Sequence, residues 1–172
     1  MKVLIVSDSH GLTSELSQIR EMHPDMDLMI HCGDSELQAD HDSLRGYAAV
    51  RGNCDFEAAF PEDRVEEAGG LRFFVTHGHR YSVKSTLMNL SYKAREMEAD
   101  IVCFGHSHGL GAEMSDGILF INPGSIWLPR GRKEKTYVIL EARGKDVTLD
   151  VYDLSNGKIP ELTQNFSLVK SE

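Results

Sequence analysis

The sequence has few cysteines and no long apolar segment. Its three cysteines, Cys32, Cys54 and Cys103, are odd in number and show no C-x-x-C spacing, which argues against a disulfide framework and a cysteine-based zinc site. No apolar run could cross a bilayer, and Met1 is followed by a predicted strand rather than by a basic region and a cleavable apolar segment. We therefore expect a cytoplasmic protein with reduced thiols and no membrane partner.

Positive charge is also scarce, since 18 lysines and arginines stand against 27 aspartates and glutamates and give a net charge of −9. A protein that binds nucleic acid without specificity needs a basic surface, so we expect no such binding. The length of 172 residues suits one well-packed domain, which we expect to span residues 1–172. The sequence leaves open whether the chain forms a homo-oligomer.

Short apolar segments recur along the chain and are typical of buried strands. Polar residues able to bind a metal follow five of them directly. Because α/β sheets bind ligands in the crevice at the carboxyl ends of strands, this placement favours a metal site. The segments and their candidates are 2–7 with Asp8 and His10, 27–31 with Asp34, 48–51 with Asn53, 71–76 with His77 and His79, and 101–104 with His106 and His108.

Each candidate also has an ordinary structural explanation. Asp8 or the adjacent Ser9 could cap the next helix, and Asp34 and Asn53 are of types common in turns. The histidine turn at 106–108 could be a polar surface loop. Repetition at five strand ends makes coincidence a poor explanation.

The remaining pattern predicts further elements. Apolar spacing indicates two helices, and paired glycines or a single glycine between alternating segments indicate hairpins. A basic loop at 130–135 could be solvated surface or the edge of an active site. The predictions are helices at 13–22 and 85–99, hairpins at 64–76 and 135–154, and a strand at 118–121.

The sequence resembles the calcineurin-like metallophosphoesterase superfamily over nearly its whole length. Its compact size and the Asn-Pro-Gly-Ser turn at 122–125 resemble the small bacterial and archaeal phosphodiesterases of the YfcE type. The resemblance implies an α/β fold, a four-layer α/β/β/α sandwich, with a dinuclear metal site. The matching motifs, in order, are Asp8-Ser9-His10, Gly33-Asp34, Gly52-Asn53, His77 and Gly105-His106-Ser107-His108.

The same resemblance implies the ligands. Asp34 would bridge two divalent ions, for which Mn²⁺ is the first candidate and Ni²⁺, Fe and Zn²⁺ are alternatives. Two such ions can lower the pKa of a bridging water and clamp an in-line displacement at phosphorus, so a small phosphate ester, and a phosphodiester first, is the expected substrate. One ion would be held by Asp8, His10, Asp34 and His108, and the other by Asp34, Asn53, His77 and His106.

Cys54 departs from the family pattern, because many members have a histidine there that assists the leaving group. A neutral thiol is a weak donor, so we expect poor assistance from Cys54, an Asp55 without the partner that it would orient, and His79 as a helper. Cys54 could equally be a small buried apolar residue. The expected catalytic residues are Asp34, Asn53, His79 and Cys54.

Two other functions stay open. The resemblance also covers the retromer subunit Vps29, whose relatives act as protein-interaction scaffolds after losing key ligands. Here all seven ligand positions keep residues able to bind metal, which favours an enzyme. A metal-dependent hydrolase of a non-phosphate ester would have the same ligands.

Overall fold

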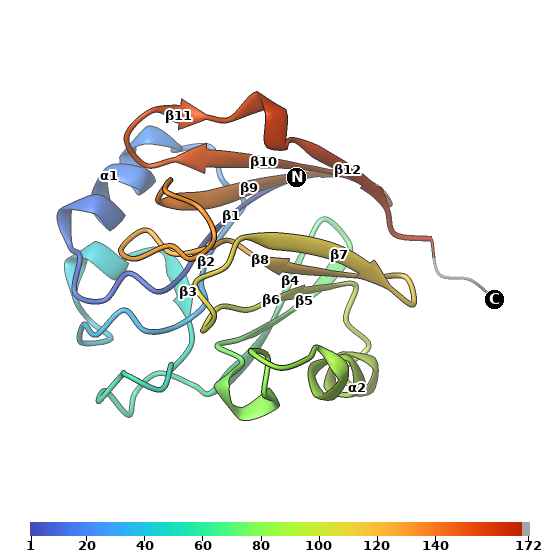
Figure 1. Ribbon diagram of the computed structural model, residues 1–172, viewed down its shortest axis with the longest axis horizontal. Helices are drawn as coiled ribbons and strands as arrows, with labels where there is room; N and C mark the ends of the chain where they lie inside the picture. The colour runs from blue at the N-terminus through green and yellow to red at the C-terminus, as the bar shows by residue number, and fades with distance from the viewer. Residues whose placement is uncertain (170–172) are drawn as a thin grey trace.

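The computed structural model describes residues 1–169 and contains two β-sheets that pack face to face (Figure 1). The last three residues of the predicted domain, 170–172, lie outside the described residues. One α-helix covers the outer face of each sheet: α1 (Ser14–Met22) and α2 (Met88–Glu96). The chain therefore has the predicted four-layer α/β/β/α arrangement.

The first sheet contains three parallel strands from the amino-terminal part of the chain. It contains β1 (Lys2–Val6), β2 (Leu28–His31), β3 (Tyr47–Ala49), β9 (Thr136–Arg143), β10 (Asp146–Asp153), β11 (Gly157–Lys158) and β12 (Gln164–Ser167). The order is β11-β10-β9-β1-β2-β3, and β12 also pairs with β10. Strands β1, β2 and β3 are parallel, whereas β9 runs antiparallel to β1.

The second sheet repeats this plan. It contains β4 (Asp63–Ala68), β5 (Leu71–Thr76), β6 (Ile101–Cys103), β7 (Gly111–Ser115) and β8 (Ile118–Asn122), in the order β4-β5-β6-β8-β7. Strands β5, β6 and β8 are parallel. The predicted hairpin between β4 and β5 is confirmed, with Gly69 and Gly70 in its turn at φ of 59° and 77°.

Alternation along the strands produces the layers, because successive side chains of a strand point to opposite faces. Val3 and Ile5 of β1 lie in the core between the sheets. Leu4, between them, packs in the core that includes Leu16 of α1. Leu90 of α2 belongs to the matching core over the second sheet. Strands buried on both faces explain why these segments are apolar without a break.

The structure also corrects several sequence expectations. Helix α1 begins at Ser14, so neither Asp8 nor Ser9 caps it. The predicted helix at 85–99 is limited to Met88–Glu96. Strands β7, β11 and β12 were not predicted, since edge strands held by a neighbour need no apolar pattern. Within residues 1–169, neither helix has the length and hydropathy needed to cross a bilayer.

Candidate metal centre

Loops at the carboxyl ends of β1, β2, β3, β5 and β6 carry all the candidate ligands, and they meet where the two sheets adjoin. Backbone hydrogen bonds tie these loops together. Asp8 N–H donates to Gly33 C=O (3.0 Å), His10 N–H to Asp34 C=O (2.9 Å) and Gly105 N–H to His77 C=O (3.0 Å). The ligand loops are therefore held in place by the backbone, whatever they bind.

The backbone at most of these positions is unusual for side-chain-bearing residues. Asp8, His10, Asp34, His106 and His108 have positive φ, between 42° and 70°. Non-glycine residues pay a conformational cost in this region, and such outliers gather at functional sites. These left-handed turns direct the side chains of the Asp-x-His and His-x-His motifs toward the ends of the strands.

Two glycines leave room for the carboxylates. A Cβ on Gly52 would collide with the Asp34 carboxylate, and a Cβ on Gly105 would collide with Ser7 and Asp8. Each aspartate thus lies directly against a bare backbone segment from another loop. The glycine of each motif is required by this close approach rather than by turn geometry alone.

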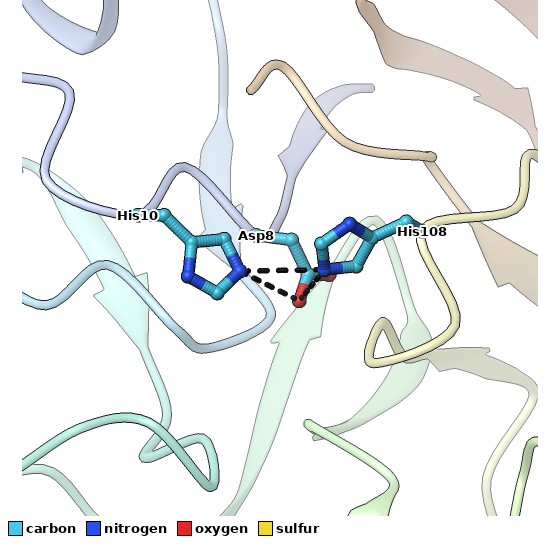
Figure 2. A group of neighbouring side chains, drawn as sticks. All are labelled: Asp8, His10 and His108. Carbon is cyan, nitrogen blue, oxygen red and sulfur yellow. Dashed lines mark hydrogen bonds and ion pairs between the residues drawn. The ribbon is translucent and has the colours of Figure 1, made fainter. Parts of the chain in front are cut away.

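The first group of ligands is Asp8, His10 and His108 (Figure 2). His108 Nδ1 donates to the carbonyl of Leu128 (2.7 Å), and His10 Nδ1 bonds the Glu36 carboxylate (2.6 Å). A neutral imidazole with its proton on Nδ1 has only a lone pair on Nε2. The two Nε2 atoms lie 3.3 Å apart and face the carboxylate of Asp8, so lone pairs converge there.

The second group is centred on His77, which is fully buried. Its Nδ1 donates to the carbonyl of Cys32 (2.8 Å), which leaves Nε2 turned toward oxygens. Nε2 lies 3.1 Å from Asp34 Oδ2, 3.0 Å from Asn53 Oδ1 and 3.8 Å from Asp8 Oδ1. The His106 ring lies 5.1 Å from the His77 ring, centroid to centroid.

Asp8 Oδ1 tests whether the site fits a metal. This oxygen is buried and has no hydrogen-bond partner among residues 1–169. Nε2 atoms of three histidines, His10, His77 and His108, lie within 3.3 to 3.8 Å of it. A buried, unpaired carboxylate oxygen is costly, and lone pairs that face one another need a cation between them. Divalent ions with nitrogen and oxygen ligands fit this arrangement.

The charges at the site suit cation binding. Burial opposes ionisation of Asp34, but the hydrogen bond from protonated His77 and the positive charge of that ring prevail and lower the pKa of Asp34 to about 2. Burial alone would lower the pKa of His77, but the hydrogen bond with Asp34 and the charge of Asp8 raise it, so a proton on His77 competes with a cation at this site. Burial and the neighbouring His77 lower the pKa of His106 to about 4. The carboxylate is therefore ionised and His106 neutral near pH 7, as metal ligands must be.

His79 and Cys54 flank the metal ligands. The His79 Nδ1 is buried and has no hydrogen-bond partner in the described part of the chain, and its ring lies 5.4 Å from that of His77. Cys54 is only partly buried, and its N–H donates to Asp34 Oδ1 (2.8 Å). Burial and the nearby carboxylates raise the pKa of the Cys54 thiol to about 11, so it is a neutral thiol near pH 7.

As expected, Asp55 has no histidine at position 54 to orient, and its carboxylate binds backbone N–H groups instead. Its Oδ2 accepts hydrogen bonds from the N–H groups of Asp34 (2.9 Å) and Gly52 (2.7 Å), and its Oδ1 accepts one from Glu36 N–H (2.8 Å). Asp55 therefore fixes the loop that presents Asp34.

Three supporting residues were not identified from the sequence. Glu36 bonds His10, and buried His31 bonds Ser9 Oγ (2.8 Å) while accepting from Gly33 N–H (3.1 Å). Ser125 Oγ donates to Asp8 C=O (2.7 Å). Only Glu36, two residues after Asp34, carried a usable signal, because a second carboxylate so close to a ligand could support the same site.

Comparison with known proteins agrees with this geometry. Residues 1–145 match the calcineurin-like phosphoesterase superfamily domain. The chain is 48% identical over 169 residues to the probable metallophosphoesterase YsnB of Bacillus subtilis, covering 98% of this chain and 100% of that protein. The match thus extends beyond the metal-binding segments to the whole chain.

Solved structures share the fold. The crystal structure of a predicted phosphoesterase from Streptococcus pneumoniae superposes with a TM-score of 0.92 at 36% identity, over 96% of this chain and 97% of that one. YfcE, a phosphoesterase from E. coli, gives 0.67 at 22% identity, over 98% and 100%. Vps29 from Entamoeba histolytica, solved with zinc, gives 0.77 at 21% identity, over 98% and 100%. The last two likenesses show the fold alone.

Proposed function

The chain belongs to the calcineurin-like phosphoesterase superfamily, and from that premise we propose that it is a phosphodiesterase that works with two divalent metal ions. The observation that carries this proposal is the convergence of lone pairs on the buried Asp8 Oδ1, which has no hydrogen-bond partner among residues 1–169. Mn²⁺ is the first candidate, and Ni²⁺, Fe and Zn²⁺ suit the same nitrogen and oxygen ligands.

The ligands divide into two sets that share Asp34. When bound, two divalent ions supply Lewis acidity, which lowers the pKa of water and neutralises charge on the phosphoryl oxygens. The first set is Asp8, His10, Asp34 and His108, and the second is Asp34, Asn53, His77 and His106.

The chain's own groups keep the ligands ready. Glu36 and the Leu128 carbonyl hold protons on Nδ1 of His10 and His108, so that each Nε2 stays free. The Cys32 carbonyl does the same for His77. Catalysis then needs no rotation or tautomer change of these rings when a phosphate ester binds.

His79 is the residue that we propose to assist the leaving oxygen. Its Nδ1 has no partner in residues 1–169, and its ring lies beside His77. The neutral thiol of Cys54 is a weaker donor, although the residue lies on the loop that presents Asn53. Weak leaving-group assistance favours substrates with good leaving groups, such as aryl phosphodiesters.

A substrate panel tests the proposal. Phosphate monoesters and diesters are each assayed with Mn²⁺, Ni²⁺, Fe²⁺ and Zn²⁺, and carboxylic esters are included as the competing class. We expect hydrolysis of phosphate esters only, with diesters preferred and activity dependent on added metal. Hydrolysis confined to carboxylic esters would reject the phosphoesterase assignment.

A protein-interaction scaffold is the second candidate, and two observations favour it. The fold is shared with Vps29, and Phe56, two residues beyond Cys54, is 95% exposed. An exposed phenylalanine on the loop that follows Asn53 could contact a partner protein. If the wild type hydrolyses nothing across the panel yet binds a protein partner that Asp34→Asn still binds, the scaffold function is correct.

A further inference from the structure

Trp127 is an exposed aromatic residue beside the metal ligands. Its side chain is 42% exposed, and its ring centroid lies 4.7 Å from that of His10 and 6.4 Å from that of His108. Both histidines belong to the group that contains Asp8. A phosphate bound at these ligands would therefore have an indole ring as its immediate neighbour.

The segment that carries Trp127 is fastened to the ligands at both ends. Ser125 Oγ donates to Asp8 C=O (2.7 Å) and accepts hydrogen bonds from the N–H groups of Trp127 (3.0 Å) and Leu128 (2.9 Å). Leu128 C=O accepts from His108 Nδ1 (2.7 Å). The position of the indole is thus set by the same bonds that orient Asp8 and His108, which gives it a defined place in the site.

Other exposed aromatic residues lack this connection. Tyr92 lies on α2 and is covered on one side by the Arg95 guanidinium, 5.3 Å from its ring centroid. Phe56 is almost fully exposed and makes no ring contact within the described residues. Only Trp127, among these three, contacts imidazoles of the metal group.

We propose that Trp127 is a stacking platform for a planar organic group of the substrate, an aryl or nucleobase-like ring attached to the phosphate ester. This inference rests on the proposed function and specifies its substrate class. An indole face stacks well on planar rings, and such stacking tolerates different rings because each has a π-face. An aliphatic ester of the same charge gains less from this surface.

A pair of non-hydrolysable ligands tests the platform without turnover. Phenylphosphonate and methylphosphonate have the same charged group and differ in the ring, so the ratio of their dissociation constants measures the ring's contribution. We would measure both by calorimetry on the Zn²⁺-loaded protein. Because Trp127 is the single tryptophan of the chain, its fluorescence reports on the same event, and phenylphosphonate should change it more than methylphosphonate does.

The variants are Trp127→Ala, Trp127→Phe and, as a distant aromatic control, Tyr92→Ala. We expect the wild type to prefer phenylphosphonate and Trp127→Ala to lose about three- to tenfold of that preference. Trp127→Phe should keep most of it, and Tyr92→Ala all of it. If Trp127→Ala does not fold, the wild type still tests the platform, because equal binding of the two phosphonates, or an equal change of Trp127 fluorescence with both, would contradict it.

Two results would overturn the inference. If the preference for phenylphosphonate is absent, or is the same in Trp127→Ala as in the wild type, Trp127 does not bind the ring. Hydrolysis of the ester panel by the wild type is measured separately. Activity on that panel without a ring preference rejects the platform alone, whereas inactivity on the panel rejects the proposed function itself.

Discussion

The two ends of the second sheet differ in how their polar groups are matched. At the amino ends of β5, β6 and β8 lies a cleft of about 630 Å³, lined by charged side chains that include Arg72 and Arg95. Arg72 pairs with Glu67 (3.3 Å) and Glu98 (3.5 Å), and Arg95 pairs with Asp116 (3.7 Å). At the carboxyl ends, where Asp8 and His10 of the first sheet meet the ligands of the second, lone pairs instead face one another, and Asp8 Oδ1 has no hydrogen-bond partner within residues 1–169.

A large cleft is therefore not by itself a reactive site. Opposite charges at the amino end satisfy each other and need no ligand, and exposed ion pairs of this kind contribute little to stability. At the carboxyl end, lone pairs face one another around the buried Asp8 Oδ1, and a bound cation or a proton on a neighbouring histidine is needed to offset them. The facing lone pairs, rather than the volume of a cleft, are the feature that supports the proposed metal centre.

The largest expected effect comes from exchanging a carboxylate for an amide at each end. Asp34→Asn removes the charge shared by both ligand sets, and we expect kcat/KM to fall by more than about 10³-fold, since a preorganised charge is among the largest contributions to catalysis. Asp116→Asn at the amino end should leave it unchanged. Steady-state kinetics and thermal unfolding of both variants decide the matter. Equal losses of kcat/KM in the two variants would contradict the difference between the two ends.

A second pair of variants compares supporting carboxylates. Glu36 bonds His10 Nδ1 at the carboxyl end, and Glu67 pairs with Arg72 at the amino end. Glu36→Gln should weaken Mn²⁺ binding about 10- to 100-fold, because the carboxylate orients the ring and raises its basicity. Glu67→Gln should not change it. Calorimetric titration with Mn²⁺ measures both, and an unchanged affinity in Glu36→Gln would mean that His10 needs no support.

The pH dependence of stability should also come from the carboxyl end. Burial lowers the pKa of His31 to about 4, whereas an unfolded chain takes up this proton near pH 6.5. The stability that comes from neutral His31 is therefore complete above pH 6.5. As pH falls toward 4, this group lowers the free energy of unfolding by about 3 kcal/mol in all. Urea unfolding of the metal-free protein between pH 4 and 7 should show a smaller loss for His31→Gln. Identical pH profiles would contradict the assignment.

The smallest expected effect concerns Cys54→His. A positioned general acid contributes about 10² to 10⁴-fold, but Asp55 uses its carboxylate on three backbone N–H groups and is not available to orient a new imidazole. We expect a gain below about tenfold, larger for alkyl monoesters than for activated aryl diesters. Comparison of kcat/KM on the two substrate types tests this. A large, equal gain on both would show that residue 54 acts on metal binding rather than on the leaving group.

The sequence predicted what depends on local pattern. Apolar runs identified β1, β2, β3, β5 and β6, and the residues after them include all the proposed ligands, because strand ends place neighbouring residues in a predictable way. Edge strands such as β7 were not predicted, because a strand held by pairing with a neighbour such as β8 needs no apolar pattern of its own. The positive φ values at the ligands all fall on Asp and His, which tolerate this region better than most residues, but residue type alone does not show which Asp or His adopts it.

The contacts between supporting residues and ligands could not be predicted, for a different reason. Ser125 bonds Asp8 across 117 residues of chain, and Glu36 bonds His10 across 26. No local spacing encodes such pairs. The bonds of Asp55 were missed for the same reason: two of its three partners are the N–H groups of Asp34 and Glu36 in another loop, which sequence patterns do not show.

Metal content measured together with activity tests the central claim most directly. The protein is stripped with a chelator, checked by elemental analysis, and titrated with Mn²⁺ while hydrolysis of a phosphodiester is followed. We predict no activity at zero metal and full recovery at two ions per chain, because the ligand sets share Asp34 and act together. Full phosphodiesterase activity at a metal content of zero would contradict the account.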